Sequence, residues 1–447
     1  RLMQTKINCK TKKPPFPDLS VGGKGELCFA GQSTRSLAEK YGTPLYLMNE
    51  DRIRERCRTF IAAARSAFGP DIACGILYAS KAASFKQIYR IMAEEGMGID
   101  VVSSGEIYTA AGAGYPLGQA FFHSNNKTDA DIEFAISHGV GNIVADGEDE
   151  IRAVSDIASS HGVRQKIILR VTPGIDPHTF AAVTTGKVDS KFGCAIETGQ
   201  ALSAVRLALS LPGIELCGFH CHVGSQIADG NVFVRAAHIM TEFIAEVYRK
   251  VGFAASVLDL GSGFFVPYTA DAEYPDIGGI MRSVADEVRR GCRLGGIPAP
   301  KVYFEPGRAI VADAGMTLYT VGSVKRIPGY RSYVSVDGGM TDNPRFALYE
   351  APYTLLDPDR PTAEDTEPFS VVGRCCESGD IIQHGVMLPR DIRRGDRIAC
   401  LTTGAYNFSM SSNYNRIPRP PVVMLSQGRS YIAVRRETYA DIAERDI

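Results

Sequence analysis

The sequence lacks the features that would place it in a membrane, in a secreted disulfide scaffold or on a nucleic acid. No apolar run approaches the roughly 20 residues that cross a bilayer, and no apolar signal core follows the basic start. The eleven cysteines are odd in number and form no CxxC pair, which is typical of free thiols in a reducing cytosol. Since 49 basic residues nearly balance 50 acidic ones, neither nucleic acid nor an anionic membrane is indicated. We therefore expect an unsecreted, cytoplasmic protein with a small-molecule ligand.

The chain does contain a regular alternation of short β-rich runs and stretches with helical spacing. The eight β-rich runs are 72–79, 98–102, 120–123, 142–145, 166–171, 215–222, 256–260 and 301–305. Helical stretches such as 130–138, 148–161, 232–250 and 282–294 lie between them. Eight strands alternating with helices predict an α/β fold with a closed, TIM-like (β/α)8 barrel that ends near Arg308.

After about Ala312 the pattern changes to short alternating strands separated by Gly, Pro and Asp turns. The predicted strands are 316–324, 333–336, 369–372, 397–401 and 422–425. This pattern favours an antiparallel C-terminal β-domain, a sandwich or a barrel, whose sheet the short runs 26–29 and 44–47 are expected to join. The predicted domains are thus an N-terminal segment 1–48, a barrel 49–311 and a β-domain 312–447.

One lysine, Lys81, ends the first predicted barrel strand, in the run Leu77–Ala82. Barrel enzymes keep their chemistry at this end of the strands. A lysine in a partly dry pocket loses its charge more readily than a free one, and the neutral amine can form a Schiff base with an aldehyde. Taken alone, however, such a lysine is more often a solvated surface group.

Two glycine-containing turns follow the seventh and eighth predicted strands, Gly261-Ser262-Gly263 and Glu305-Pro306-Gly307-Arg308. Barrel enzymes often bind phosphate there, because glycine lets backbone N–H groups approach an anion, although a lone GxG is more often a tight turn. A lysine together with a phosphate site points to pyridoxal phosphate, whose ring nitrogen needs an acidic partner. Glu305 has that chemistry, and a local salt bridge with Arg308 is the equal alternative.

Two histidines, His220 and His222, alternate at the end of the sixth predicted strand and therefore face the same side. A zinc site would need further ligands at suitable spacing, and the sequence shows none, so we predict no metal. The favoured interpretation is an imidazole stacked on a cofactor ring, with Ser225 reaching the phosphate.

Two runs in the predicted β-domain carry further candidates. Gly373–Asp380 sets Cys375 and Cys376 beside acids, and nearby carboxylates keep a thiol protonated, which suits a proton donor. Small strand residues are nevertheless the more usual role of such cysteines. The Ser/Asn-rich run Thr403–Tyr414 carries aromatic residues and by itself is compatible with a simple turn.

Together these motifs resemble one family from about Leu27 to Leu425. It is the fold-type III, alanine-racemase-like group of pyridoxal-phosphate enzymes, and within it the diaminopimelate decarboxylases. The matching runs are YASKA, GIDVVSSGE, HSNNK, RVTPGIDPHT, SKFG, CHVGSQ, EPGR, VDGGMTDNPRFALYEA, CCESGD and GAYNFSMSSNYN. Many matches in the right order are far more specific than any single one. The resemblance implies a pyridoxal 5'-phosphate-dependent carboxy-lyase that converts meso-2,6-diaminopimelate, at its D-centre, to L-lysine and CO2, the last step of lysine biosynthesis.

The resemblance also implies roles for individual positions. Lys81 would be the Schiff-base lysine, and Cys376 the proton donor, supplied by the other subunit of a homodimer. The implied cofactor-binding residues are Lys81, His222, Ser225, Gly261, Gly263, Glu305, Gly307, Arg308 and Tyr406. The implied substrate-binding residues are Arg308, Arg345, Tyr349, Glu377 and Tyr406, with Glu377 receiving the distal amine. Asp100 and Arg170 resemble supporting residues, and the role of His123 stays open.

The sequence departs from the family pattern at two positions, with Phe346 where proline is expected and Ser262 in place of the middle glycine of GGG. Neither change removes a side chain that the chemistry requires. Three alternatives share most of the motifs: a racemase of the same fold, a decarboxylase of D-lysine or D-ornithine, and a non-catalytic pyridoxal-phosphate-binding homologue.

Overall fold

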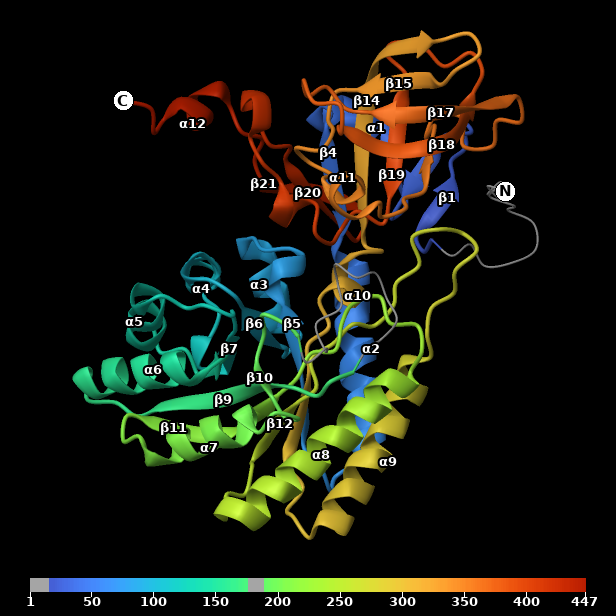
Figure 1. Cartoon of the computed structure of the whole chain (residues 1–447). Coiled ribbons are helices and arrows are strands. Elements are labelled where there is room, and N and C mark those ends of the chain that lie inside the picture. The colour runs from blue at the N-terminus through green and yellow to red at the C-terminus, as the bar shows by residue number, and fades with distance from the viewer. Residues whose placement is uncertain (1–15, 176–188) are drawn as a thin grey trace. The chain divides into compact units, whose positions relative to one another are not determined.

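The computed structural model describes residues 16–175 and 189–447 (Figure 1). The chain forms two compact units that interleave in sequence. The barrel unit comprises Arg56–Phe265 and Pro275–Gly307, and the β unit comprises the residues up to Glu55, Val266–Tyr274 and Arg308–Ile447. The domain limits 49–311 and 312–447 stay a prediction. Residues 176–179 of the run RVTPGIDPHT and the start of the segment 1–48 lie outside the described residues.

Eight parallel strands close the barrel, each hydrogen-bonded to the next in sequence, with the last paired to the first. They are β5 (Cys74–Ala79), β6 (Gly98–Val101), β7 (Ala120–Phe122), β8 (Asn142–Ala145), β9 (Gln165–Thr172), β11 (Ile214–His220), β12 (Val257–Asp259) and β13 (Lys301–Phe304). The short β10 (Cys194–Ala195) pairs with β9 outside this ring. Each of the eight predicted runs overlaps one of these strands, so the predicted barrel is confirmed.

One helix precedes the first barrel strand, and others lie between successive strands; their apolar residues recur at helical spacing and bury one face. They are α2 (Glu50–Phe68), α3 (Lys86–Glu94), α4 (Ser104–Gly112), α5 (Asp129–Ser137), α6 (Glu148–Ser160), α7 (Gln200–Ser210), α8 (Asn231–Val251) and α9 (Ile277–Gly295). Thr128 starts α5 with a capping box, in which its side chain accepts from the Asp131 N–H and the Asp131 carboxylate accepts from the Thr128 N–H. The two longest segments after β11, α8 and α9, pack side by side (Figure 1).

The inside of the barrel is filled in layers. An apolar layer of Leu77, Phe121, Val144, Ile168 and Cys217 takes one side chain from each of five strands. Space there is tight, because a Cβ on Gly98 would lie 2.3 Å from Leu77 Cδ2. Since inward-facing residues repeat every second position along a strand, the residue two places beyond this layer also points inward, nearer the carboxyl end.

The β unit is built on a mixed sheet in the order β18-β17-β15-β14-β4-β20-β21, with β19 also paired to β14 and to β16. Its strands are β4 (Leu45–Asn49), β14 (Gly315–Arg326), β15 (Ser332–Val336), β16 (Leu355–Leu356), β17 (Thr366–Val372), β18 (Ile381–Pro389), β19 (Arg397–Leu401), β20 (Val422–Ser426) and β21 (Arg429–Val434). All five predicted strands are present. Most pairs are antiparallel as predicted, but β15–β17 and β20–β4 are parallel. The second of these arises where β4, which precedes the barrel, lies between β14 and β20.

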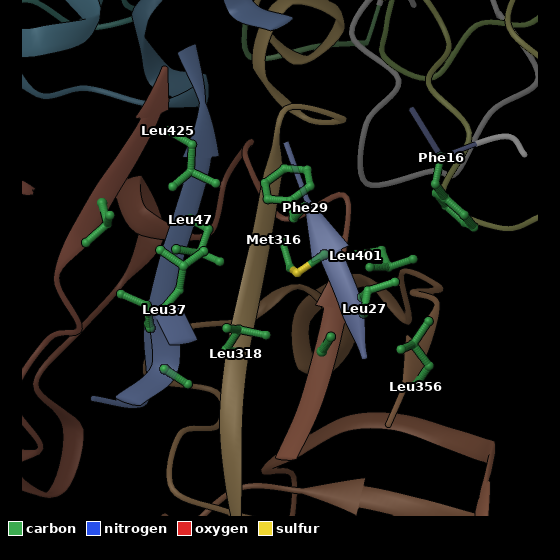
Figure 2. Close-up of a cluster of buried hydrophobic side chains, with 14 residues drawn as sticks. Phe16, Leu27, Phe29, Leu37, Leu47, Met316, Leu318, Leu356, Leu401 and Leu425 are labelled. Atoms are coloured by element: carbon green, nitrogen blue, oxygen red, sulfur yellow. The ribbon is translucent and has the colours of Figure 1, made fainter. Parts of the chain in front are cut away.

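The N-terminal strands divide between two sheets. β4 joins the large sheet as predicted, whereas β1 (Leu19–Val21), β2 (Leu27–Phe29) and β3 (Gln32–Ser33) form a separate three-stranded sheet, followed by α1 (Thr34–Tyr41). Both contribute to one hydrophobic cluster with β14, β19 and β20 (Figure 2). Leu27 and Phe29 of β2, Leu47 of β4 and Leu425 of β20 belong to it. Burial of this cluster ties the start of the chain to its last third.

Among the residues that the structure describes, no helix combines the length and apolar character needed to cross a membrane.

Candidate functional site

A polar layer lies beyond the apolar layer inside the barrel. Two of its members, His123 and Arg170, stand two positions after residues of the apolar layer. Asp259 and Glu305 stand two positions after Val257 and Tyr303, which pack against that layer, and Asp100 and His220 come from β6 and β11. All six side chains are buried. The polar layer, defined as Asp100, His123, Arg170, His220, Asp259 and Glu305, therefore stands at the carboxyl ends of the strands, where barrel enzymes carry their chemistry.

Glu305 is the centre of this layer. The Nε2 atom of His220 lies 3.2 Å from its Oε2, and Nε2 of His123 lies 2.7 Å from its Oε1, the latter off the line of a hydrogen bond. Burial alone would raise the pKa of Glu305, but the neighbouring histidines outweigh it and hold that pKa well below its usual range. Glu305 is therefore ionised although it is 6% exposed.

Two further carboxyl groups near Glu305 behave in the opposite way. Burial, and then the charge of Glu305, raise the pKa of Asp259 well above its usual range. Burial likewise raises the pKa of Asp100 to about 6, with His123 opposing the shift and Glu305 adding to it. Of these three carboxyl groups, Glu305 therefore ionises most readily.

The two alternating histidines of β11 have separate partners. His220 faces Glu305, whereas His222 Nδ1 accepts from the backbone N–H of Ser262 at 3.3 Å. Burial lowers the pKa of His222 well below its usual value, with Lys81 and Arg170 adding to the effect. His222 is thus a neutral imidazole at the glycine turn after β12.

That turn has no room for side chains. A Cβ on Gly261 would lie 2.6 Å from Cys221 O, and one on Gly263 would lie 2.3 Å from Gly224 O. Both residues have positive φ, +62° and +132°, which favours glycine. Gly307 is similarly confined, since a Cβ there would lie 2.8 Å from Ala79 O. The loop after β12 therefore approaches the backbone of the loop after β11, and the loop after β13 approaches the end of β5, which leaves backbone groups close together at the mouth of the barrel, as a phosphate site requires.

Lys81 lies in the 3-10 turn η1 (Ser80–Ala82) directly after β5. Its charge acts on Asp100, Glu106 and His222, which places it at the same end of the barrel as the polar layer. Its neighbours Ser80 and Ala82 are buried, but Lys81 itself is exposed. The partly dry surroundings expected for Lys81 from the sequence stay a prediction.

A second cluster, the Arg–Tyr cluster, lies within the β unit and consists of Tyr268, Arg308, Arg345, Tyr353 and Tyr406. The Tyr268 hydroxyl accepts from Arg308 Nη1 at 2.9 Å and from Arg345 Nη1 at 3.1 Å. Burial would raise the pKa of Tyr268, yet the two guanidinium groups lower it. Two buried cations thus converge on one oxygen, which is the geometry of an anion-binding site.

Two other tyrosines complete the Arg–Tyr cluster. Arg345 Nη1 also donates to the Tyr353 hydroxyl at 3.1 Å, which accepts from Asn407 as well. The Tyr406 ring lies 4.7 Å from the Arg308 guanidinium and 5.7 Å from that of Arg345, both cation–π distances. Tyr406 has a positive φ of 62°, which is uncommon for a non-glycine residue.

The remaining predicted residues lie on the loops of the β unit. Cys376 and Glu377 are exposed, and Tyr349 is half-buried at the end of α11 (Arg345–Tyr349). The Cys376 N–H donates to Asn415 Oδ1 at 2.8 Å. Burial and then Asp380 raise the pKa of Cys375 to about 12, so the effect of neighbouring acids falls on this thiol. Ser225 is half-buried after β11.

Sequence reasoning missed Asp259 and Tyr268. Asp259 could have been found, because it stands two residues before Gly261 and in phase with the inward-facing side of β12. Tyr268 gave no signal. It belongs to Val266–Tyr274, a segment that leaves the barrel unit between β12 and α9 and belongs to the β unit.

Comparisons with known proteins agree with this geometry. Residues 50–312 match the family model described as the pyridoxal-binding domain of pyridoxal-dependent decarboxylases, and this fold and site define that class of enzyme. The diaminopimelate decarboxylase of Bacillus subtilis (strain 168) is 42% identical over 423 residues, which is 95% of each chain. A crystal structure of that enzyme from M. jannaschii has a TM-score of 0.88 at 30% identity, covering 97% of this chain and 98% of its own.

The chain belongs to the diaminopimelate decarboxylase family. A lysine/ornithine decarboxylase from Vibrio vulnificus, solved with putrescine, is similar at 25% identity and a TM-score of 0.73, over 88% of this chain and 97% of its own. The predicted family, barrel fold, pyridoxal-phosphate dependence and carboxy-lyase class are confirmed.

Proposed function

We propose that this protein decarboxylates meso-2,6-diaminopimelate at its D-centre, releasing L-lysine and CO2. The observation that carries the choice of substrate is the convergence of two buried guanidinium groups, Arg308 and Arg345, on one oxygen. Such a pair suits a second carboxylate, which diaminopimelate has and which lysine and ornithine lack. The relatives named diaminopimelate decarboxylase support the same choice.

The polar layer and the glycine turns fit pyridoxal 5'-phosphate. Glu305 is held as an anion, which a protonated ring nitrogen needs, and the confined Gly261, Gly263 and Gly307 leave backbone room for a phosphate. The residues that would hold the cofactor are Lys81, His222, Ser225, Gly261, Gly263, Glu305, Gly307, Arg308 and Tyr406. When bound, the cofactor supplies an electron-withdrawing ring that stabilises the charge left on the substrate carbon as CO2 departs.

The chain's own groups then have separate tasks. Lys81 provides the amine that attaches the cofactor aldehyde, and the neutral His222 provides a flat surface for the ring. Arg308, Arg345 and Tyr349 bind the distal carboxylate end, and Glu377 accepts hydrogen bonds from the distal amine. The Cys376 thiol returns a proton to the substrate carbon, as a thiol does when it is protonated.

We also propose that the protein acts as a homodimer in the cytoplasm, with Cys376 and Glu377 of one protomer completing the site of the other. Both side chains are exposed on their own unit, which leaves them available to a neighbouring protomer.

A CO2-release assay with meso-diaminopimelate, D-lysine, D-ornithine and L-lysine tests the reaction. We expect turnover of meso-diaminopimelate and a kcat/KM at least about 10²-fold lower for D-lysine and D-ornithine, because their smaller ends leave Arg308 and Arg345 unpaired. Comparable rates with D-lysine would instead assign a broader D-amino-acid decarboxylase. Cofactor binding without CO2 release from any of the four compounds would assign a non-catalytic homologue.

A further inference from the structure

Two imidazoles enclose the carboxylate of Glu305, although the proposed reaction gives neither of them a task. His123 comes from the end of β7 and His220 from the end of β11, and each reaches a different oxygen of Glu305, at 2.7 and 3.2 Å. The two rings meet nearly edge to face, with centroids 4.7 Å apart. Both histidines are at most 5% exposed, so their packing fixes where the carboxylate can lie.

The direction of the His220 contact follows from its protonation. Burial lowers the pKa of His220 to about 3, so the ring is neutral at ordinary pH and carries one N–H. An ionised carboxylate can only accept, so the proton is on Nε2 and is donated to Glu305. Nδ1 correspondingly has no hydrogen-bond partner among the described residues.

Asp259 completes the enclosure. Its side chain is fully buried, and one ligand atom from each of Asp259, Glu305, His123 and His220 lies within 4.8 Å of the others. Asp259 Oδ1 accepts from the Gly261 N–H at 2.9 Å, which connects the cluster to the glycine turn. Burial and the charge of Glu305 raise the pKa of Asp259, so Glu305 is the acid of this cluster that ionises first.

We propose that His123 and His220 are positioning residues that fix both oxygens of Glu305 and keep it ionised, so that it can hold a proton on the ring nitrogen of pyridoxal phosphate. The inference rests on the proposed function, in which Glu305 is the partner of that nitrogen. It assigns a task to His123, which the family resemblance left open.

A zinc ion held by the same four residues is the competing explanation. Two ligands of a tetrahedral zinc site with bonds of about 2.1 Å stand roughly 3.4 Å apart. The 2.7 Å between His123 Nε2 and Glu305 Oε1 is shorter, as expected for direct contact between the two groups.

The test compares His220→Phe, which removes the donor, with His220→Gln, whose amide can replace Nε2. Each full-length apoprotein is titrated with pyridoxal 5'-phosphate and with its analogue in which carbon replaces the ring nitrogen, and binding is followed by visible absorption. We expect His220→Phe to weaken binding of the normal cofactor about tenfold and binding of the analogue less than about twofold. His220→Gln should restore most of the affinity, and His123→Phe should resemble His220→Phe.

His238→Phe is the matched control. It also removes a histidine–glutamate contact of the barrel unit, 2.9 Å between His238 Nδ1 and Glu287, but on the half-exposed surface of α8. We expect no change in affinity for either compound. If His220→Phe does not fold, His220→Asn, whose amide is too short to reach Glu305, should show the same selective loss.

Three results would overturn the inference: equal weakening for both compounds, unchanged binding in all His123 and His220 variants, or one equivalent of zinc bound by the wild-type apoprotein and lost in His220→Phe. These results leave the proposed function standing as long as the wild type binds the cofactor and releases CO2. A wild type that binds no pyridoxal phosphate would overturn both.

Discussion

In the polar layer of the barrel unit, carboxyl and imidazole groups that titrate surround Glu305, with Arg170 as the one arginine. In the Arg–Tyr cluster of the β unit, the two positive charges belong to guanidinium groups that stay cationic at any ordinary pH. In the polar layer, the pKa of Glu305 is lowered, whereas that of Asp259 is raised and that of His220 is lowered to about 3. In the Arg–Tyr cluster, Arg308 and Arg345 stay charged and instead lower the pKa of the tyrosine between them.

The difference matches the tasks proposed for the two clusters. A group that must hold a proton on a cofactor nitrogen needs a tuned pKa, which a set of neighbouring carboxyl and imidazole groups provides. A group that must recognise a carboxylate needs a lasting charge with fixed geometry, which arginine provides. The following changes test this division, from the largest expected effect to the smallest.

Lys81→Ala should abolish both CO2 release and the visible absorption band of the bound cofactor, because no other amine is proposed to hold the aldehyde. Absorption spectra of the purified protein and the CO2 assay measure this. Lys86→Ala, which removes an exposed lysine from the start of α3, is the control and should leave both unchanged. A normal spectrum in Lys81→Ala would show that the cofactor is attached elsewhere.

Cys376→Ala should lower kcat by about 10²–10⁴-fold, the usual contribution of a general acid, while the cofactor spectrum stays normal. The neighbouring Cys375→Ala should change kcat little. Mixing Cys376→Ala with Lys81→Ala subunits should restore part of the activity if two protomers share a site. Absence of recovery after demonstrated subunit exchange would contradict the shared site.

Arg345→Met should lower kcat/KM for meso-diaminopimelate by about 10²-fold and reduce the preference over D-lysine, because the distal carboxylate loses a forked partner. Arg345→Lys should recover only part of the loss, since the lysine ammonium lacks the planar fork that binds a carboxylate in bidentate geometry. The exposed Arg331→Met is the control. An unchanged preference in Arg345→Met would separate this residue from substrate recognition.

Tyr268→Phe should raise KM for meso-diaminopimelate about tenfold with little change in kcat, because Arg308 and Arg345 lose the oxygen that sets their spacing. The rate with D-lysine, which needs no distal carboxylate site, should change less. Steady-state kinetics with both compounds separate this effect from a general loss of folding, which would lower both rates together.

Asp342→Asn should change how the stability of the protein depends on pH and leave activity at neutral pH nearly unaltered. Asp342 is a buried carboxyl of the β unit whose pKa burial raises from 3.8 to about 7, although it accepts from Tyr319 and from the Gly339 N–H. When folding raises the pKa of a carboxyl, the folded protein loses stability as pH rises from the unfolded to the folded pKa, by about 1.4 kcal/mol per pH unit. The wild type should therefore lose stability from about pH 4 to 7, and Asp342→Asn should flatten this slope in thermal unfolding. Equal slopes would show that Asp342 is not the titrating group.

Much of the fold could be predicted because its signals are local. The eight barrel strands are short apolar runs between helical stretches, and each was placed within a few residues. The parallel pairs in the β unit could not be predicted, because β4 and β20 lie at opposite ends of the chain and nothing in either run sets their relative direction. The sheet that each N-terminal strand joins could not be predicted either, because β2 and β4 are both short apolar runs, yet β2 pairs with β1 and β3 while β4 joins the large sheet.

The sequence by itself determined the barrel and the family, because periodicity and motif spacing are properties of neighbouring positions. Only the tertiary structure decided that His123 and His220, 97 positions apart, both reach Glu305, and that Tyr268 lies between Arg308 and Arg345. It also decided which buried acid carries the charge. These outcomes depend on burial and on distances between strands that meet only when the chain has folded, since both the cost of burying a charge and its attraction to a partner depend on those surroundings.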